Sequence, residues 1–153
     1  MANTYTQLYI HIVFVVKFRE TVIHDSWEER LHKYIIAIVQ NNKYKVLAIN
    51  SAFDHVHLFI GLNPAQSIAA LMRQVKHESS QFINTNKLTP TLFRWQEGYA
   101  AFCYSHSHIP NVIKYIETQK EHHKKLTFRE EYIKLLKLFD VEYNEKYIFK
   151  NLE

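Results

Sequence analysis

The order in which strand-like and helix-like segments follow one another constrains the fold of this chain most. Apolar segments, several of them alternating, predict four strands, at residues 9–16, 45–50, 55–62 and 99–104. Apolar residues at helical spacing predict helices at about 26–41, from Ser67, from Pro110, and over 127–138. Ser26, with Glu29 three residues later, resembles a capping box. The order β-α-β-β-α-β predicts an α+β, ferredoxin-like (RRM-like) antiparallel sheet with helices on one face, plus C-terminal helices.

This order also predicts which residues meet on the sheet. In a ferredoxin-like sheet the first and third strands lie together at the centre. His11 of the first strand is therefore expected beside His55 or His57 of the third. The sheet face opposite the two main helices is expected to be free for a ligand or a second subunit.

Length and composition fit one domain over residues 1–153. The chain has 47% hydrophobic and 22% charged residues, which is typical of a globular domain. Cys103 is the only cysteine, so no intrachain disulfide can form and a cytoplasmic location is expected. No signal peptide or membrane span is expected. The net charge of +4 is compatible with binding to nucleic acid without requiring it.

The pair His55 and His57 is the most informative motif for chemistry. Alternate residues of a strand point to the same face, so both imidazoles leave the sheet side by side while Val56 packs on the other face. Two imidazoles on a rigid strand can bind one metal ion, although two solvated histidines fit the same spacing. A metal site would need a third ligand.

Tyr115 and Gln119 lie four residues apart in a predicted helix, and therefore on one helix face. The carbonyl oxygen of Gln119 is a hard ligand suited to Mg²⁺ or Mn²⁺. The phenol oxygen of Tyr115 can attack phosphorus and form a covalent ester. An exposed tyrosine and a solvated amide are the alternatives that spacing alone leaves open.

Together these segments resemble the single-tyrosine transposases of the insertion-sequence-200 type. Asp54-His55-Val56-His57-Leu58 is similar to their HUH motif (histidine, bulky apolar residue, histidine). Segments that match in the same order are His11-Ile12-Val13-Phe14, Trp95-Gln96-Glu97-Gly98-Tyr99 and Tyr115 to His123. The likeness covers a core of about residues 5–128, followed by a C-terminal helix and tail over 127–153.

The resemblance implies a DNA transposase that cleaves and rejoins single-stranded DNA at hairpin-bearing transposon ends. His55, His57 and Gln119 would bind one divalent ion, Mg²⁺ or Mn²⁺. Tyr115 would form the 5′-phosphotyrosine intermediate. The resemblance also implies a homodimer in which the tyrosine helix of one subunit completes the histidine pair of the other.

Several further residues are weaker candidates. His11 and His122 are candidates for contacts that orient the metal ligands. Basic residues that could contact the DNA backbone are Lys17, Arg19, Arg73, Lys76, Lys120, Lys124 and Lys125.

Two other functions fit the sequence. A non-catalytic RRM-like nucleic-acid-binding protein would share the fold, but it would carry aromatic residues where this chain has the histidine pair. A domesticated relative acting on genomic repeat hairpins would share the chemistry and differ in its substrate.

Overall fold

Four antiparallel strands form one sheet in the order β2-β3-β1-β4. A computed structural model describes residues 5–122, 127–144 and 148. The strands are β1 (Tyr9–Val15), β2 (Lys45–Ser51), β3 (His55–Gly61) and β4 (Ala100–Tyr104). The helices are α1 (Asp25–Asn41), α2 (Ile68–Thr85), α3 (Ile109–Glu117), α4 (Gln119–His122) and α5 (Phe128–Leu138), with 3₁₀ turns η1 (Lys17–Arg19) and η2 (His106–His108). The predicted ferredoxin-like order is confirmed, with β1 and β3 at the centre.

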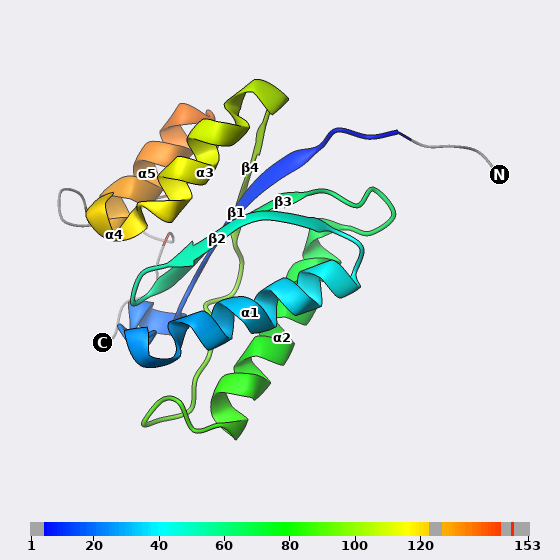
Figure 1. Ribbon diagram of the computed structural model, residues 1–153. Helices are drawn as coiled ribbons and strands as arrows, with labels where there is room; N and C mark the ends of the chain where they lie inside the picture. Colours follow the sequence, from blue (N-terminus) through cyan, green and yellow to red (C-terminus); the bar gives the residue numbers. More distant parts are fainter. Residues whose placement is uncertain (1–4, 123–126, 145–147, 149–153) are drawn as a thin grey trace.

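One face of the sheet packs on α1 and α2 (Figure 1). Alternate residues of the central strands, such as Ile12, Phe14 and Leu58, point to this side and are completely buried. Leu31 and Ile35 of α1 meet them from the helix side, as their spacing predicts. This layer is the main hydrophobic core.

The other face of the sheet is covered, so the expectation of a free face is wrong. Val13 and Phe102 of the sheet pack against Phe128 and Leu135 of α5. Phe59 packs against Ile116 of α3. Figure 1 shows α3, α4 and α5 together on this side, opposite α1 and α2. The apolar residues that β1, β3 and β4 present here give these helices a second surface on which to pack.

Two predicted helix starts have different outcomes. Ser67 caps α2 as predicted, since its hydroxyl accepts a hydrogen bond from the backbone N–H of Ala70 at 3.0 Å. The predicted cap at Ser26 is wrong, because α1 begins at Asp25 and His24 occupies the cap position. The backbone carbonyl of His24 accepts the first helical hydrogen bonds, and burial of Trp27 fixes that first turn.

None of the helices in the described parts of the chain combines the length and the apolar character needed to cross a bilayer.

Candidate metal and tyrosine site

His55 and His57 lie side by side on the covered face of β3, and both are completely buried. Their ring centroids are 5.0 Å apart. In the central strand pair they stand opposite Val15 and Val13 of β1. The rigid centre of the sheet therefore holds both imidazoles under α3 and α5.

Two neighbours fix the orientation of His55. Its Nδ1 lies 2.7 Å from Oδ1 of Asp54, and its ring stacks on Phe128 with a centroid distance of 3.5 Å. A carboxylate hydrogen-bonded to one ring nitrogen leaves the other nitrogen as the ligand atom. That atom, Nε2, lies 3.8 Å from Oε1 of Glu131.

His57 is held on both sides of its ring. Its Nδ1 lies 2.8 Å from Nε2 of His11, and its Nε2 lies 3.1 Å from Oε1 of Glu131. The predicted proximity of His11 to the pair is confirmed, and His11 is itself completely buried. The structure thus brings His11 against His57, where it can orient that ring.

Glu131 of α5 is the residue that the sequence interpretation missed. It is only 2% exposed, and it contacts both histidines of the motif. The spacing of the sequence could have revealed this residue. Glu131 lies three residues after Phe128 and four before Leu135, and therefore on the apolar face of α5. A carboxylate on such a face is rarely buried without a partner.

His55, His57 and Glu131 form a group that could hold a divalent metal ion. Their ligand atoms all lie within 4.8 Å of one another. Burial lowers the pKa of His57, which favours the neutral imidazole that binds metal. Burial alone would raise the pKa of Glu131, but the hydrogen bond with His57 and the nearby imidazoles outweigh it and lower that pKa. Two imidazoles and one carboxylate within this distance are a donor set that fits a divalent ion.

Tyr115 and Gln119 also reach this cluster, although they do not share one continuous helix. Helix α3 ends at Glu117, Thr118 departs from helical geometry, and Gln119 begins α4. The carbonyl of Lys114 accepts both the Thr118 hydroxyl at 2.8 Å and the Thr118 backbone N–H at 3.1 Å. Side-chain hydrogen bonds nevertheless link Gln119 to His57 and to Tyr115.

The Tyr115 ring stands edge-on to His57, with centroids 6.0 Å apart. Its hydroxyl donates a hydrogen bond to the Glu131 carboxylate. Burial, followed by the negative charge of Glu131, raises the pKa of Tyr115. The phenol is therefore protonated in this arrangement, and it lies against the group that could hold a metal.

Contacts with β2 and with α1 hold the tyrosine-bearing segment against its own chain. The Asn50 side chain of β2 donates to the carbonyls of Ile116 at 2.9 Å and Glu117 at 3.1 Å. Lys120 of α4 forms ion pairs with Asp25 and Glu28 of α1, both at 3.0 Å. The predicted site residues therefore meet within a single chain.

The other basic candidates lie elsewhere. Lys17 and Arg19 form the turn η1, Arg73 is exposed on α2, and Lys76 donates to the backbone carbonyls of Gln96 and Gly98. Lys124, Lys125 and the side chain of His122 are outside the described residues. Contact of these residues with DNA remains a prediction.

The sequence of this chain matches one protein family and one well-described relative. A family model described as IS200-like transposase matches residues 4–119, more than half of the chain. The ISDra2 transposase TnpA of Deinococcus radiodurans is 27% identical over 120 residues, covering 75% of this chain and 86% of that protein.

Two solved structures share the fold. A crystal structure from Deinococcus radiodurans R1, named as that of a transposase, has a TM-score of 0.62 at 22% identity and covers 78% of this chain and 95% of that one. A REP-associated tyrosine transposase bound to a REP hairpin has a TM-score of 0.60 at 13% identity, covering 100% and 93% of the two chains. With the sequence match, the order of strands and the clustered histidines, these findings lead to one assignment: the chain belongs to the IS200-like transposase family.

Proposed function

We propose that this transposase cleaves and rejoins single-stranded DNA at hairpin-bearing ends, with Tyr115 as the nucleophile. The observation that carries the proposal is the meeting of the half-buried Tyr115 and of Gln119 with the buried His55, His57 and Glu131 in one cluster. A structural neighbour bound to a REP hairpin supports hairpin-bearing DNA as the substrate class.

The proposed reaction exchanges one ester for another. The Tyr115 oxygen bonds to phosphorus, the bond from phosphorus to the 3′ oxygen breaks, the phenol releases its proton, and the 3′ oxygen leaves as a hydroxyl. A 3′-hydroxyl from a second cut end reverses these steps and joins two strands. Because the phosphotyrosine ester replaces the broken phosphodiester bond of the DNA, rejoining the strands needs no external energy source.

The site would hold one divalent ion, Mg²⁺ or Mn²⁺, through His55 and His57, with Gln119 or Glu131 as oxygen ligands. When bound, such an ion stabilises the charge that grows on the phosphoryl oxygens. Imidazole nitrogen suits Mn²⁺ better than Mg²⁺, so we expect Mn²⁺ to support activity at least as well.

The homodimer with composite sites is proposed on the family resemblance. In the described chain Tyr115 lies against its own His57, so a composite site requires α3 and α4 to leave the contacts made by Asn50 and Lys120. Mixing inactive His57→Ala and Tyr115→Phe proteins tests this part. Recovered cleavage supports composite sites, and persistent inactivity means that each chain acts on its own.

The proposed activity is tested by incubating the protein with hairpin-bearing single-stranded DNA and Mn²⁺, followed by a denaturing gel. We expect a protein–DNA adduct with the parent protein and none with Tyr115→Phe, because phenylalanine lacks the attacking oxygen. Hairpin binding should survive this change. Nicking of the same DNA by Tyr115→Phe would refute the assignment of the nucleophile.

A further inference from the structure

His11 of β1 contacts the candidate metal site through one hydrogen bond. Its Nε2 lies 2.8 Å from Nδ1 of His57, and the two rings are stacked, with centroids 5.0 Å apart and 24° between their planes. A bond between two ring nitrogens contains one hydrogen, which one imidazole donates and the other accepts. The direction of this bond decides whether the other nitrogen of His57 is protonated or bare.

Glu131 determines that direction in the described arrangement. Nε2 of His57 lies 3.1 Å from Oε1 of Glu131, and this carboxylate also accepts the Tyr115 hydroxyl. An ionised carboxylate only accepts hydrogen bonds, so Nε2 of His57 carries the hydrogen. His57 is completely buried, which favours a neutral ring with a single hydrogen. Its Nδ1 is therefore bare, and His11 donates to it.

The second nitrogen of His11 is left over by this assignment. Nδ1 of His11 is buried and has no hydrogen-bond partner among the described residues. A buried polar atom without a partner costs free energy, and a native structure rarely keeps one without a reason. A free nitrogen on His11 has a use if this ring must sometimes hold its hydrogen there.

The surroundings of His11 hold its ring in place. The rings of Phe102 and Tyr104 on β4 each have centroids 6.2 Å from that of His11, and the Tyr115 ring is 6.3 Å away. Close packing of this kind keeps a buried side chain in one rotamer. His11 can still change from donor to acceptor, because the hydrogen of a neutral imidazole can reside on either nitrogen.

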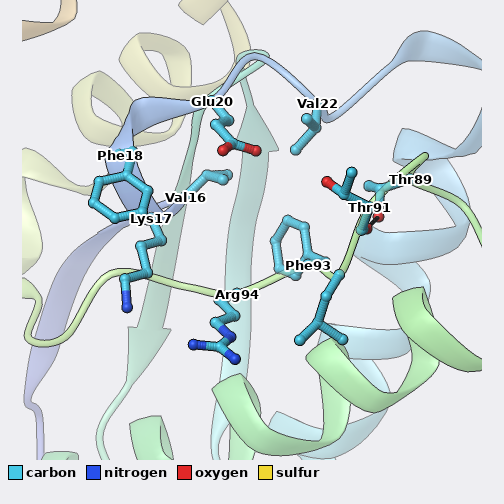
Figure 2. A pocket seen from close by; sticks show the side chains of 10 residues that line it. Val16, Lys17, Phe18, Glu20, Val22, Thr89, Thr91, Phe93 and Arg94 are labelled. Carbon is cyan, nitrogen blue, oxygen red and sulfur yellow. Dashed lines mark hydrogen bonds between the residues drawn. The ribbon is translucent and has the colours of Figure 1, made fainter. Parts of the chain in front are cut away.

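His11 lies in the closed part of the sheet, whereas the chain opens beyond the end of β1. Val16, which follows this strand, lines a pocket of about 390 Å³ between η1 and residues 89–94 (Figure 2). Neither His11 nor His57 lines that pocket. Both rings are completely buried, so bulk water does not compete for the bond between them.

His55 has a partner of a different kind. Its Nδ1 lies 2.7 Å from Oδ1 of Asp54, and an ionised carboxylate can only accept. His55 therefore carries its hydrogen on Nδ1, and its Nε2 is bare and ready to bind an ion. The two histidines of the motif thus differ. His57 must change tautomer before its Nε2 can act as a ligand.

We propose that His11 is a positioning residue that lets His57 change tautomer when the site takes up a divalent ion. Without an ion, His11 donates through Nε2 to His57, and His57 donates through Nε2 to Glu131. With an ion, His57 carries its hydrogen on Nδ1 and donates to Nε2 of His11, which carries its own hydrogen on Nδ1. This inference rests on the proposed function for the presence of the ion.

The change conserves protons and leaves both rings neutral. The proton on Nε2 of His11 crosses to Nδ1 of His57, the proton on Nε2 of His57 is released, and Nδ1 of His11 takes one up. A partner that only accepts, as Asp54 does for His55, would leave a bare nitrogen against the Glu131 carboxylate in the empty site. A partner that both donates and accepts stabilises the empty and the loaded site without moving the His57 ring.

The tautomers are measured on the full parent chain by NMR that correlates the imidazole nitrogens with the ring protons. Spectra are recorded in EDTA and then, after its removal, with Zn²⁺, a diamagnetic probe that imidazole and carboxylate ligands suit. We expect the hydrogen of His57 to move from Nε2 to Nδ1 on addition of Zn²⁺, and that of His11 to move in the same sense. An unchanged tautomer in either ring would overturn the proposal.

Two substitutions separate the hydrogen bond of His11 from its packing. His11→Phe keeps a ring but removes both nitrogens, and it should weaken Mn²⁺ binding by about tenfold or more. His11→Gln provides an amide that can donate or accept, so it should bind Mn²⁺ within about threefold of the parent. His77→Phe makes the first change at an exposed position of α2 and is the matched control. Parent-like affinity in His11→Phe, or equal losses in the two His11 variants, would contradict the proposal.

The NMR measurement uses the parent chain without DNA, so neither misfolding of a variant nor the choice of substrate affects it. It also keeps this inference separate from the proposed function. A change of tautomer without any DNA adduct at Tyr115 would refute the proposed function alone. An adduct at Tyr115 in a protein whose histidines keep their tautomers would refute the role of His11 alone.

Discussion

At the scale of single residues, Glu131 changes how the histidine motif is understood. His55 and His57 alone would supply two imidazole ligands, and the Glu131 carboxylate would add the negative charge that favours a divalent ion in a buried place. Glu131 also lies beyond residue 119, the last residue matched by the family model. Its position is therefore a feature of this chain that the family match does not cover.

Glu131→Gln should weaken Mn²⁺ binding by about tenfold or more, because it removes the charge while keeping the shape of the side chain. The measurement is a titration of the full chain followed by electron paramagnetic resonance of free Mn²⁺. Glu130→Gln makes the same change at an exposed neighbour on α5 and should bind Mn²⁺ like the parent. Parent-like affinity in Glu131→Gln would remove Glu131 from the set of ligands.

At the scale of elements, the docking of α3 on β2 decides where Tyr115 stands. Asn50 lies opposite His57 in the β2–β3 pair and donates to the last carbonyls of α3. These carbonyls have no partner within a helix that ends there. One side chain of the sheet therefore closes the helix and positions it beside the cluster.

Asn50→Asp should release α3, because it replaces a donor with a carboxylate that faces two carbonyl oxygens. We expect faster hydrogen exchange in residues 109–117 and a loss of about 1–3 kcal/mol in the free energy of unfolding. Asn111→Asp makes the same chemical change at an exposed position of α3 and serves as the control. Equal exchange in the two variants would mean that Asn50 does not hold the helix.

The sequence predicts elements well where one signal dominates. Alternation predicts β1, and an apolar run predicts β3. Ser67 correctly marks the start of α2, whereas Pro110 lies in the first turn of α3, which begins one residue earlier at Ile109. Ser26 fails as a cap because packing of Trp27 decides where α1 begins. The break at Thr118 is a change in the backbone angles of one residue, which residue spacing does not reveal.

At the scale of the whole molecule, the sheet is covered on both faces, and α5 closes the second core. Phe128 and Leu135 of this helix pack on Val13 and Phe102, and Glu131 stands between them in the sequence. Pairing of distant segments across a sheet is not encoded in local periodicity. The sequence therefore predicts that α5 exists but not that it completes the candidate metal site.

Leu135→Ala should lower the free energy of unfolding by about 2–4 kcal/mol, because it leaves a cavity in this second core. Leu138→Ala, on the same helix and 71% exposed, should cost less than about 0.5 kcal/mol. Urea denaturation measures both values. Similar costs for the two variants would show that α5 does not pack on the sheet as described.

We propose above all that Tyr115 becomes covalently linked to DNA beside the histidine and glutamate cluster. The most direct test is tandem mass spectrometry of the adduct that forms with hairpin-bearing single-stranded DNA and Mn²⁺, after digestion with nuclease and protease. We expect one modified peptide, with a nucleotide joined through its 5′ phosphate to the Tyr115 oxygen. A modification on another residue, or a link through a 3′ phosphate, would contradict it.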